Sequence, residues 1–401
     1  MRDYLRQLSA TGGLGGPALV ALAVLSLTAF AFFRVALLPE FGAELGMSTF
    51  QLGAVTTIFA VGRLGADLPG GHLADRFPAR GILAISAGAV AAGSLMVGLS
   101  VGVVTLYAAS LLLGIASSTT NATGMTYFSN VAGAGYRGTS MAVFSAALLG
   151  GQALGPTAAG LVASVGGWRV AMYVAAGAAG LVALALGFTG GRPAAGGSSG
   201  PVDRLQETEE SAMSRGAMVV LQSVSFAVFL TLGSIPQTLV PVVGSDILGL
   251  GAASIGLALG LGGVSRFVGT LIGGRLSDRV SRKAALVPAL VVQGMGVGLL
   301  ALPPSIALWL AAIVVMSIAS YAVAVAATII GDLAHPARVG RHLGRFRFAG
   351  DVGLILGPIS VSAIYESLSR QAAFLVVAAV LVGVGLLCLR LLPETQPSSG
   401  S

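Results

Sequence analysis

The stretch Gly71-His72-Leu73-Ala74-Asp75-Arg76 recurs 203 positions later as Gly274-Arg275-Leu276-Ser277-Asp278-Arg279. Arg63 and Arg266 are separated by the same 203 positions, and other matching pairs keep nearly this spacing. Several anchors at one offset indicate that the chain contains two copies of one structural unit. In each copy the polar motif follows a long apolar segment, which places it at the end of a predicted helix.

The composition around these copies is that of a membrane protein. Hydrophobic residues make up 55% of the 401 residues, charged residues make up 9%, and the mean hydropathy is +0.91. Soluble domains carry about 25% charged residues, so this chain lacks the charge to cover a water-exposed surface. The composition excludes an ordinary cytosolic enzyme, a disordered chain and a collagen. Cys388 is the single cysteine, which excludes a disulfide scaffold and a cysteine metal cluster.

Long apolar runs predict an all-α integral membrane protein. A bilayer core about 30 Å thick requires about 20 apolar residues per helix. Runs of this length recur along the chain without the polar–apolar alternation of barrel strands. We expect twelve transmembrane helices, near residues 17–38, 49–72, 81–100, 103–130, 139–165, 169–189, 217–241, 252–275, 284–302, 306–332, 347–366 and 371–392.

The basic residues predict how the chain enters the membrane. With a cytoplasmic N-terminus, 17 of the 22 Lys and Arg residues fall in cytoplasmic segments, and only Arg169 and Arg370 fall in outer loops. The remaining three, Arg34, Arg63 and Arg266, lie within predicted helices. The positive-inside rule then predicts a plasma-membrane protein, of the bacterial inner membrane, with both termini in the cytoplasm. This topology also explains the pI near 10.2 without a nucleic-acid partner.

Residues 190–216 interrupt the apolar pattern. They are rich in Gly, Ser and Pro and then acidic, which is typical of a flexible, solvated linker. Six predicted helices lie on each side of it. We therefore expect an N-terminal six-helix bundle at 1–189, a cytoplasmic linker at 190–216 and a C-terminal six-helix bundle at 217–401. Because each half has an even number of helices, both halves enter from the same side, as in a parallel repeat.

The duplicated motif resembles the signature of the major facilitator superfamily, G-x-L-[A/S]-D-R-x-G-R-[R/K], although Pro78 and Ser281 replace the family glycine. The resemblance covers the whole chain and implies two pseudo-symmetric six-helix bundles, the major facilitator fold, that work by alternating access. It also implies a breakable cytoplasmic latch, in which the acidic residue contacts a helix N-terminus in the other half. Loops that serve only as tight turns and topology signals are the alternative. The predicted latch residues are Gly71, Asp75, Arg76, Gly274, Asp278 and Arg279.

A glycine–proline motif in the fifth predicted helix resembles one enriched in the drug/proton antiporter branch of this superfamily. Glycines four apart allow helix backbones to approach closely, and proline bends a helix. A generic packing kink is the alternative. The fourth predicted helix departs from those antiporters, because Ser110 stands where they commonly carry an arginine. The helix-kink motif comprises Gly151, Gly155, Pro156 and Gly160, with Gly357 and Pro358 in the second half.

Acidic residues inside predicted helices are costly in a bilayer and are therefore candidates for function. Asp67 lies four residues after Arg63, so the two share a helix face and can form a permanent ion pair. Alternatively, Asp67 gains and loses a proton and couples transport to a proton gradient. Asp351 follows Arg347 by four residues and is a helix-end charge or a second proton site.

Two further arginines inside predicted helices are not followed by an acidic residue four positions later, as Arg63 is. Arg266 is followed after four residues by Thr270, so its counter-charge must come from another helix, from water or from the substrate. Arg34 lies near the outer end of the first helix. It is placed either to bind an anion or to extend outward to Glu40 or Glu44.

In the superfamily, the first, fourth, seventh and tenth helices line the central cavity. Here these four helices carry aromatic side chains and small hydroxyls with little fixed charge, which suits an amphiphilic substrate. Small polar residues also pack membrane helices together, which is the alternative for each of them. The candidate substrate-cavity residues are Phe30, Arg34, Ser117, Ser118, Asn121, Gln222, Ser225, Phe226, Phe229, Arg266, Ser320 and Tyr321.

These features predict a secondary active transporter and not an enzyme. The sequence has no Walker motif, no metal-ligand spacing and no nucleophile–base pair, and we expect no cofactor. The first hypothesis is proton-coupled efflux of a small amphiphilic drug or metabolite by a monomer in the lipid bilayer, with the proton as coupling ion. The alternative is transport of a small organic or inorganic anion bound by Arg34, Arg63 and Arg266. A non-transporting receptor would need a partner-binding domain, and the longest polar segment is the linker.

Overall fold

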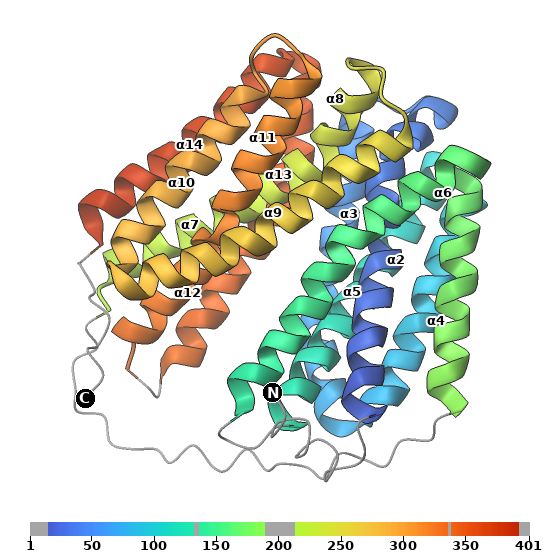
Figure 1. The fold of residues 1–401 in the computed structure, drawn as a ribbon, viewed down its shortest axis with the longest axis horizontal. Coiled ribbons are helices and arrows are strands. Elements are labelled where there is room, and N and C mark those ends of the chain that lie inside the picture. Colours follow the sequence, from blue (N-terminus) through green and yellow to red (C-terminus); the bar gives the residue numbers. More distant parts are fainter. Residues whose placement is uncertain (1–14, 132–135, 189–212, 336–337, 393–401) are drawn as a thin grey trace. The chain divides into compact units, whose positions relative to one another are not determined.

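The computed structural model describes residues 15–131, 136–188, 213–335 and 338–392 (Figure 1). Every regular element within these ranges is helical. The first half of the sequence forms α2 (Gly15–Leu45), α3 (Thr49–Arg76), α4 (Ala79–Gly98), α5 (Val103–Val131) and α6 (Arg137–Phe188). The second half forms α7 (Arg215–Ser234), η2 (Ile235–Leu239), α8 (Val240–Asp246), α9 (Ala252–Arg279), α10 (Arg282–Leu299), α11 (Ile306–Ile318), η3 (Ala319–Tyr321), α12 (Ala322–Leu333), α13 (Val339–Ser367) and α14 (Arg370–Leu391).

The described residues form two compact units. The first contains 15–47, the described residues of 58–188, and 251–260; the second contains 48–57, 213–250 and the described residues of 261–392. Two short segments belong to the unit of the opposite half: 48–57, the start of α3, and 251–260, the start of α9. They lie 203 positions apart. The predicted bundles, 1–189 and 217–401, did not include this exchange of segments. Residues 190–212 of the predicted linker lie outside the described ranges.

Among the described residues, nine helices are long and apolar enough to cross a membrane. One of them, Gly138–Phe188, contains two helical arms that meet at the non-helical Gly167, and these arms correspond to the two predicted spans 139–165 and 169–189. Two other predicted spans correspond to α3 and α10, which are outside the nine. Arg63 and Asp67 interrupt the apolar run of α3, and the 18 residues of α10 include Arg282, Lys283 and Gln293, which lower its mean hydropathy. The count of twelve spans stays a prediction.

The path deviates from regular α-helix at three places, one between two predicted spans and two inside predicted spans. In α6, Gly167 has φ +80° and ψ 167°, which kinks the path between two helical arms. A side chain rarely adopts this φ, so glycine is the residue that fits. Between α7 and α8, the five residues of η2 form a π-helical turn that contains Pro236. A short 3₁₀ turn, η3, connects α11 and α12. Mid-helix 3₁₀ stretches and π-helical turns often mark hinges or functional sites.

Serine side chains begin several helices. Ser48 and Gln51 form a reciprocal capping box at the start of α3, with Ser48 N donating to Gln51 Oε1 at 2.9 Å. Ser281 caps α10, since its Oγ accepts from Ala284 N at 3.0 Å. Ser281 stands where the family motif has glycine, and the cap explains how the chain uses that position. In the first copy, Pro78 immediately precedes α4.

Glycines bring α6 and α2 into backbone contact in the first unit. A Cβ on Gly151 would meet Leu25 O and Thr28, and a Cβ on Gly155 would meet Ala29 O. The second unit repeats the arrangement between α13 and α7, where Gly353 lies against Phe226 O and Gly357 against Leu230 O. Close backbone approach at these glycines therefore occurs in both halves, at positions 202 residues apart.

The last glycine of the motif has a different neighbour. Gly160 lies against Ala252 O, at the start of α9, and Gly256 of the same segment lies against Pro156 O. Thr157 Oγ1 donates to Gly256 O at 3.1 Å within this contact. These residues all belong to the first unit, so the motif packs the first turns of α9 into it.

Candidate functional site

Arg34 is buried in the first unit, and no acidic side chain among the described residues pairs with it. Its side chain is 1% exposed, and Nε, Nη1 and Nη2 have no hydrogen-bond partner among the described residues. Its contact is aromatic: the guanidinium carbon lies 3.9 Å from the centroid of the Phe59 ring. The alternative predicted from the sequence, an outward reach to Glu40 or Glu44, is wrong for this structure, since Glu44 instead accepts from Trp168 and Arg169.

The magnitudes show that this arrangement is unfavourable for folding. A desolvated cation–π contact contributes about 2 kcal/mol. Taking a charged side chain out of water costs several kcal/mol. Arg34 is 1% exposed and has no acceptor among the described residues, so its guanidinium bears this cost without a hydrogen bond in return. Phe59 therefore does not compensate the buried charge.

One face of α3 carries an aromatic residue, a cation and an acid in succession. Phe59, Arg63 and Asp67 are spaced by four residues, so they lie on the same side of the helix, about 6 Å apart along its axis. Arg63 Nε is buried without a partner, and the positive charge of Arg63 acts on Arg34. Phe59, 1% exposed, also packs edge-on against Phe32 at 6.1 Å between ring centroids. We call Arg34, Phe59 and Arg63 the arginine–phenylalanine cluster.

Asp67 uses a partner from another helix. Ser118 Oγ of α5 donates to Asp67 Oδ1 by a short hydrogen bond, and Ser118 is fully buried. The predicted ion pair between Arg63 and Asp67 is not formed among the described side chains. Close helix packing makes the serine contact possible, because Gly62 lies against Leu111 O and Gly114 against Phe59 O at the α3–α5 crossing.

The candidate cavity residues of the second unit mostly contact neighbouring helices. Ser225 and Phe229 of α7 lie where a Cβ on Gly350 of α13 would be, and Gln222 Nε2 donates to Arg345 O at 3.4 Å. Tyr321 lies against Gly273 of α9. Ser320 Oγ donates within its own turn to Ser317 O at 2.7 Å. Their role as cavity residues stays a prediction.

The remaining candidates are half-buried side chains. Phe30 packs edge-on against Phe33, with 5.7 Å between the ring centroids. The others with intermediate exposure are Ser117 and Asn121 on α5, Phe226 on α7, Arg266 on α9 and Asp351 on α13.

The second copy of the predicted latch forms a local ion-pair network. Arg282 Nη1 donates to Asp278 Oδ1 at 2.5 Å, and Arg282 Nε donates to Asp332 Oδ2 at 3.0 Å. These hydrogen bonds, with Asp278 first, raise the pKa of the Arg282 guanidinium. The network joins the ends of α9, α10 and α12 within the second unit. The side chain of Asp75, the acid of the first copy, lies outside the described part of the chain. Latching to a helix of the other half stays a prediction.

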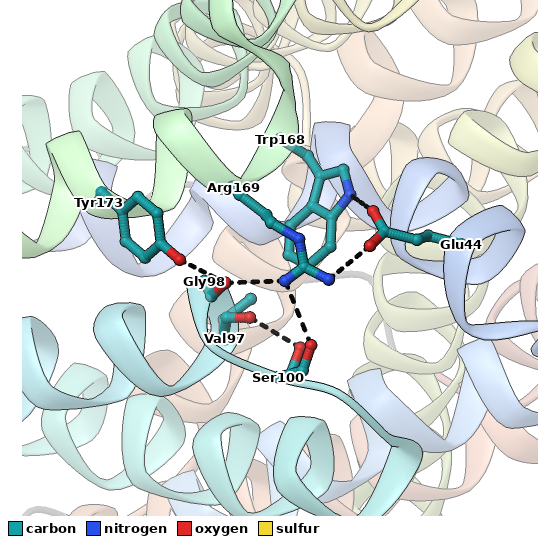
Figure 2. Close-up of polar contacts among 7 residues, drawn as sticks. All are labelled: Glu44, Val97, Gly98, Ser100, Trp168, Arg169 and Tyr173. Carbon is teal, nitrogen blue, oxygen red and sulfur yellow. Dashed lines mark hydrogen bonds and ion pairs between the residues drawn. The ribbon is translucent and has the colours of Figure 1, made fainter.

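Figure 2 shows a polar clamp that the sequence did not predict. Trp168 Nε1 donates to Glu44 Oε2 at 2.6 Å, and Arg169 forms an ion pair with the same carboxylate. Arg169 Nη1 also donates to Gly98 O at 3.0 Å and to Ser100 O at 3.3 Å. The clamp joins the ends of α2 and α4 to α6 just after the Gly167 kink. From the sequence, Arg169 was predicted only to be a charge in an outer loop.

Comparison with known proteins assigns the family. The profile described as Major Facilitator Superfamily matches residues 19–265 and 217–401. The chain belongs to the major facilitator superfamily. It is therefore a membrane transporter and not an enzyme, with the all-α integral membrane fold predicted from the sequence.

Individual relatives agree with this assignment. The class C tetracycline resistance protein of Escherichia coli is 30% identical over 153 residues, which is 38% of this chain and 37% of that protein. Among solved structures, a bacterial homologue of the human lysosomal transporter Spinster has a TM-score of 0.73 at 14% identity, over 96% of this chain and 95% of that one. A POT family transporter has a TM-score of 0.75 at 12% identity, over 96% and 97%.

The nucleoside transporter NupG gives a TM-score of 0.73 at 16% identity, over 94% of this chain and 99% of that one. At such identities, these structures support the fold alone. They differ in what their names say they carry, so the substrate must be argued from the side chains of this chain.

Sequence reasoning missed Phe59 as part of the candidate site. A signal was present, since Phe59 lies one helical turn before Arg63, and an aromatic ring near a buried arginine predicts a cation–π contact. Which ring faces Arg34, however, depends on how α2 packs on α3, and the spacing within one helix does not determine that packing.

Proposed function

We propose that this transporter exports a small amphiphilic compound in exchange for protons, by alternating access. It acts as a monomer in a bacterial inner membrane, with both termini in the cytoplasm. The observation that carries the proposal is Asp67, an acid within α3 whose partner is a neutral hydroxyl, Ser118, and not a cation. An aspartate locked in an ion pair would keep one charge state, whereas a carboxylate held by a hydroxyl can bind and release a proton.

The surroundings of Asp67 suit a coupling role. Arg63 lies one turn away on the same helix face but forms no ion pair with Asp67 among the described side chains. Ser118 donates to that ionised form and is able to accept from the protonated form, because a hydroxyl has both functions. Asp67 and Ser118 would therefore stay hydrogen-bonded to each other whether or not Asp67 carries a proton.

The similarity to a tetracycline resistance protein supports export as the direction. The helix-kink motif supports the same branch of the superfamily, and its glycines pack α6 closely against α2. Against it stands Ser110, at the place where an arginine is common in such antiporters.

Transport into proteoliposomes tests the proposal. With an imposed pH gradient, we expect the wild-type protein to accumulate tetracycline or rhodamine 6G and to move protons in the opposite direction. Asp67→Asn should abolish gradient-driven accumulation and retain exchange of the amphiphile at equal pH. The matched control is Asp246→Asn, which changes an exposed acid at the end of α8. The proposal is wrong if neither amphiphile responds to the gradient, or if Asp67→Asn transports like the wild type.

A further inference from the structure

We propose that the arginine–phenylalanine cluster binds the anionic group of the transported compound, and that this compound is an organic anion with a flat apolar body. The inference rests on the proposed transport function and names its substrate class. It does not depend on the direction of transport or on the coupling ion. Its residues, Arg34, Phe59 and Arg63, all belong to the first unit.

The first argument is the unmet bonding capacity of Arg34. A guanidinium is a planar fork of five N–H donors that stays charged, and it matches the two oxygens of a carboxylate. Here all three nitrogen atoms are buried, no described residue offers them an acceptor, and the side chain is 1% exposed. Native proteins pair nearly all buried polar groups. A buried fork of donors that finds no acceptor among the described residues calls for an acceptor from outside them, which a bound anion would supply.

The second argument is the sign of the neighbouring charge. Arg63 is the charged group that acts on Arg34, and it is also positive. Its Nε is another buried donor without a partner. Two cations in apolar surroundings repel each other, and an anion between or beside them removes that repulsion. The acid nearest along α3, Asp67, is bonded to Ser118 and does not neutralise Arg63 in this structure.

The third argument concerns the body of the ligand. Phe59 stacks under Arg34 at 3.9 Å, and Phe32 meets Phe59 edge-on. A carboxylate attached to an aromatic ring or a chain would place its charge at the guanidinium and its apolar part against these rings. A small inorganic anion would leave the rings without a ligand contact. The cluster therefore favours an organic anion over chloride or phosphate.

The cluster contains only two of the three arginines that the sequence predicted as an anion site. Arg266 belongs to the second unit and already has an interaction of its own. Arg34 and Arg63 are thus the two arginines that the structure brings together. Because Arg34 is covered by Phe59, ligand entry requires movement of that ring or of α3. Helix movement of this kind is part of transport by alternating access.

Binding to the purified full-length protein in detergent tests the inference. The anionic probes are benzoate, 2-naphthoate and decanoate, and their matched controls are benzyl alcohol and benzylamine. Calorimetry and ligand-dependent thermal shift should detect at least one carboxylate, with benzyl alcohol and benzylamine weaker by about tenfold or more, as expected for loss of a charged hydrogen bond. If none of the three carboxylates binds, or if benzylamine binds as tightly as benzoate, the inference is overturned.

Variants locate the binding. Arg34→Gln should weaken carboxylate affinity by about tenfold to a hundredfold, and Arg34→Lys should recover part of it, because a point charge replaces the fork. Arg63→Gln provides a second variant if Arg34→Gln does not fold. Arg390→Gln, an exposed arginine in the last turn of α14, is the control with the same change in net charge. Carboxylate affinity within twofold of the wild type in both Arg34→Gln and Arg63→Gln would reject the cluster as the site.

The same binding assay separates this inference from proton-coupled export. Asp67→Asn should retain carboxylate binding, because Asp67 is not part of the cluster. Carboxylate binding that depends on Arg34, together with no pH-driven flux, would reject the proton coupling and support the anion site. The reverse result, pH-driven flux of amphiphiles without any carboxylate binding, would reject the anion site and support proton-coupled export.

Discussion

Arg169 and Arg370 make equivalent contacts in the two halves of the chain, 201 positions apart. Arg169 donates to Gly98 O and Ser100 O at the end of α4, and Arg370 donates to Leu300 O at 3.2 Å and Leu302 O at 3.1 Å, at the end of α10. The last carbonyls of a helix have no partner within it. Each arginine supplies those partners, so the repeat seen in the sequence extends to an unpredicted structural contact.

Arg169 makes further contacts beyond the equivalent ones, so we expect replacement of the two arginines to cost unequal amounts of stability. Arg169→Gln should lower the free energy of unfolding by about 1–3 kcal/mol, and Arg370→Gln by less. The difference arises because Arg169 also pairs with Glu44 and stacks on Trp168, with 4.4 Å from its guanidinium carbon to the ring centroid. Thermal unfolding in detergent, followed by tryptophan fluorescence and by loss of soluble monomer, measures both. Equal losses would mean that Glu44 and Trp168 add nothing.

Two adjacent glycines in α6 provide a matched pair of substitutions. Gly151→Ala should destabilise the first unit by about 1–3 kcal/mol, because the added methyl would overlap Leu25 O and Thr28 at a crossing that cannot widen freely. Gly150→Ala should be neutral or stabilising by up to about 1 kcal/mol, since its nearest neighbour is the end of the Leu25 side chain at 3.6 Å. A chemical-denaturation midpoint for each variant decides the comparison. Similar effects of both would show that the helices do not meet at Gly151.

Ser281 replaces the family glycine, and we expect its substitution to lower the stability of the protein. Ser281→Ala should destabilise by about 1 kcal/mol because the N-terminus of α10 loses its cap, whereas Ser281→Gly should cost only a few tenths. Both are read from the shift in thermal midpoint, with Ser223→Ala as a control on the exposed surface of α7. A larger loss for glycine than for alanine would contradict capping as the role of Ser281.

Local patterns predicted the helices better than the contacts between them. Apolar runs and capping residues are properties of one segment, and α4, α5 and α14 lie close to the predicted spans. The pairing of Asp67 with Ser118 instead of Arg63 depends on the crossing of α3 and α5, which spacing within α3 does not contain. The same holds for Arg34. Its sequence neighbours offered Glu40 and Glu44, but Glu44 is taken by the α6 clamp.

Arg34 gives the sharpest stability prediction, because a structural role and a ligand-binding role predict opposite signs. If Arg34 serves packing through Phe59, its removal destabilises the protein. If it is held ready for an anion, then Arg34→Met removes an uncompensated buried charge, keeps most of the apolar volume, and stabilises the ligand-free protein by about 1–3 kcal/mol. Arg34→Lys retains the charge and should not stabilise. Unfolding midpoints are compared in buffer without carboxylates. A lower midpoint for Arg34→Met would favour the packing role, because the cation–π contact would then outweigh the cost of burying the charge.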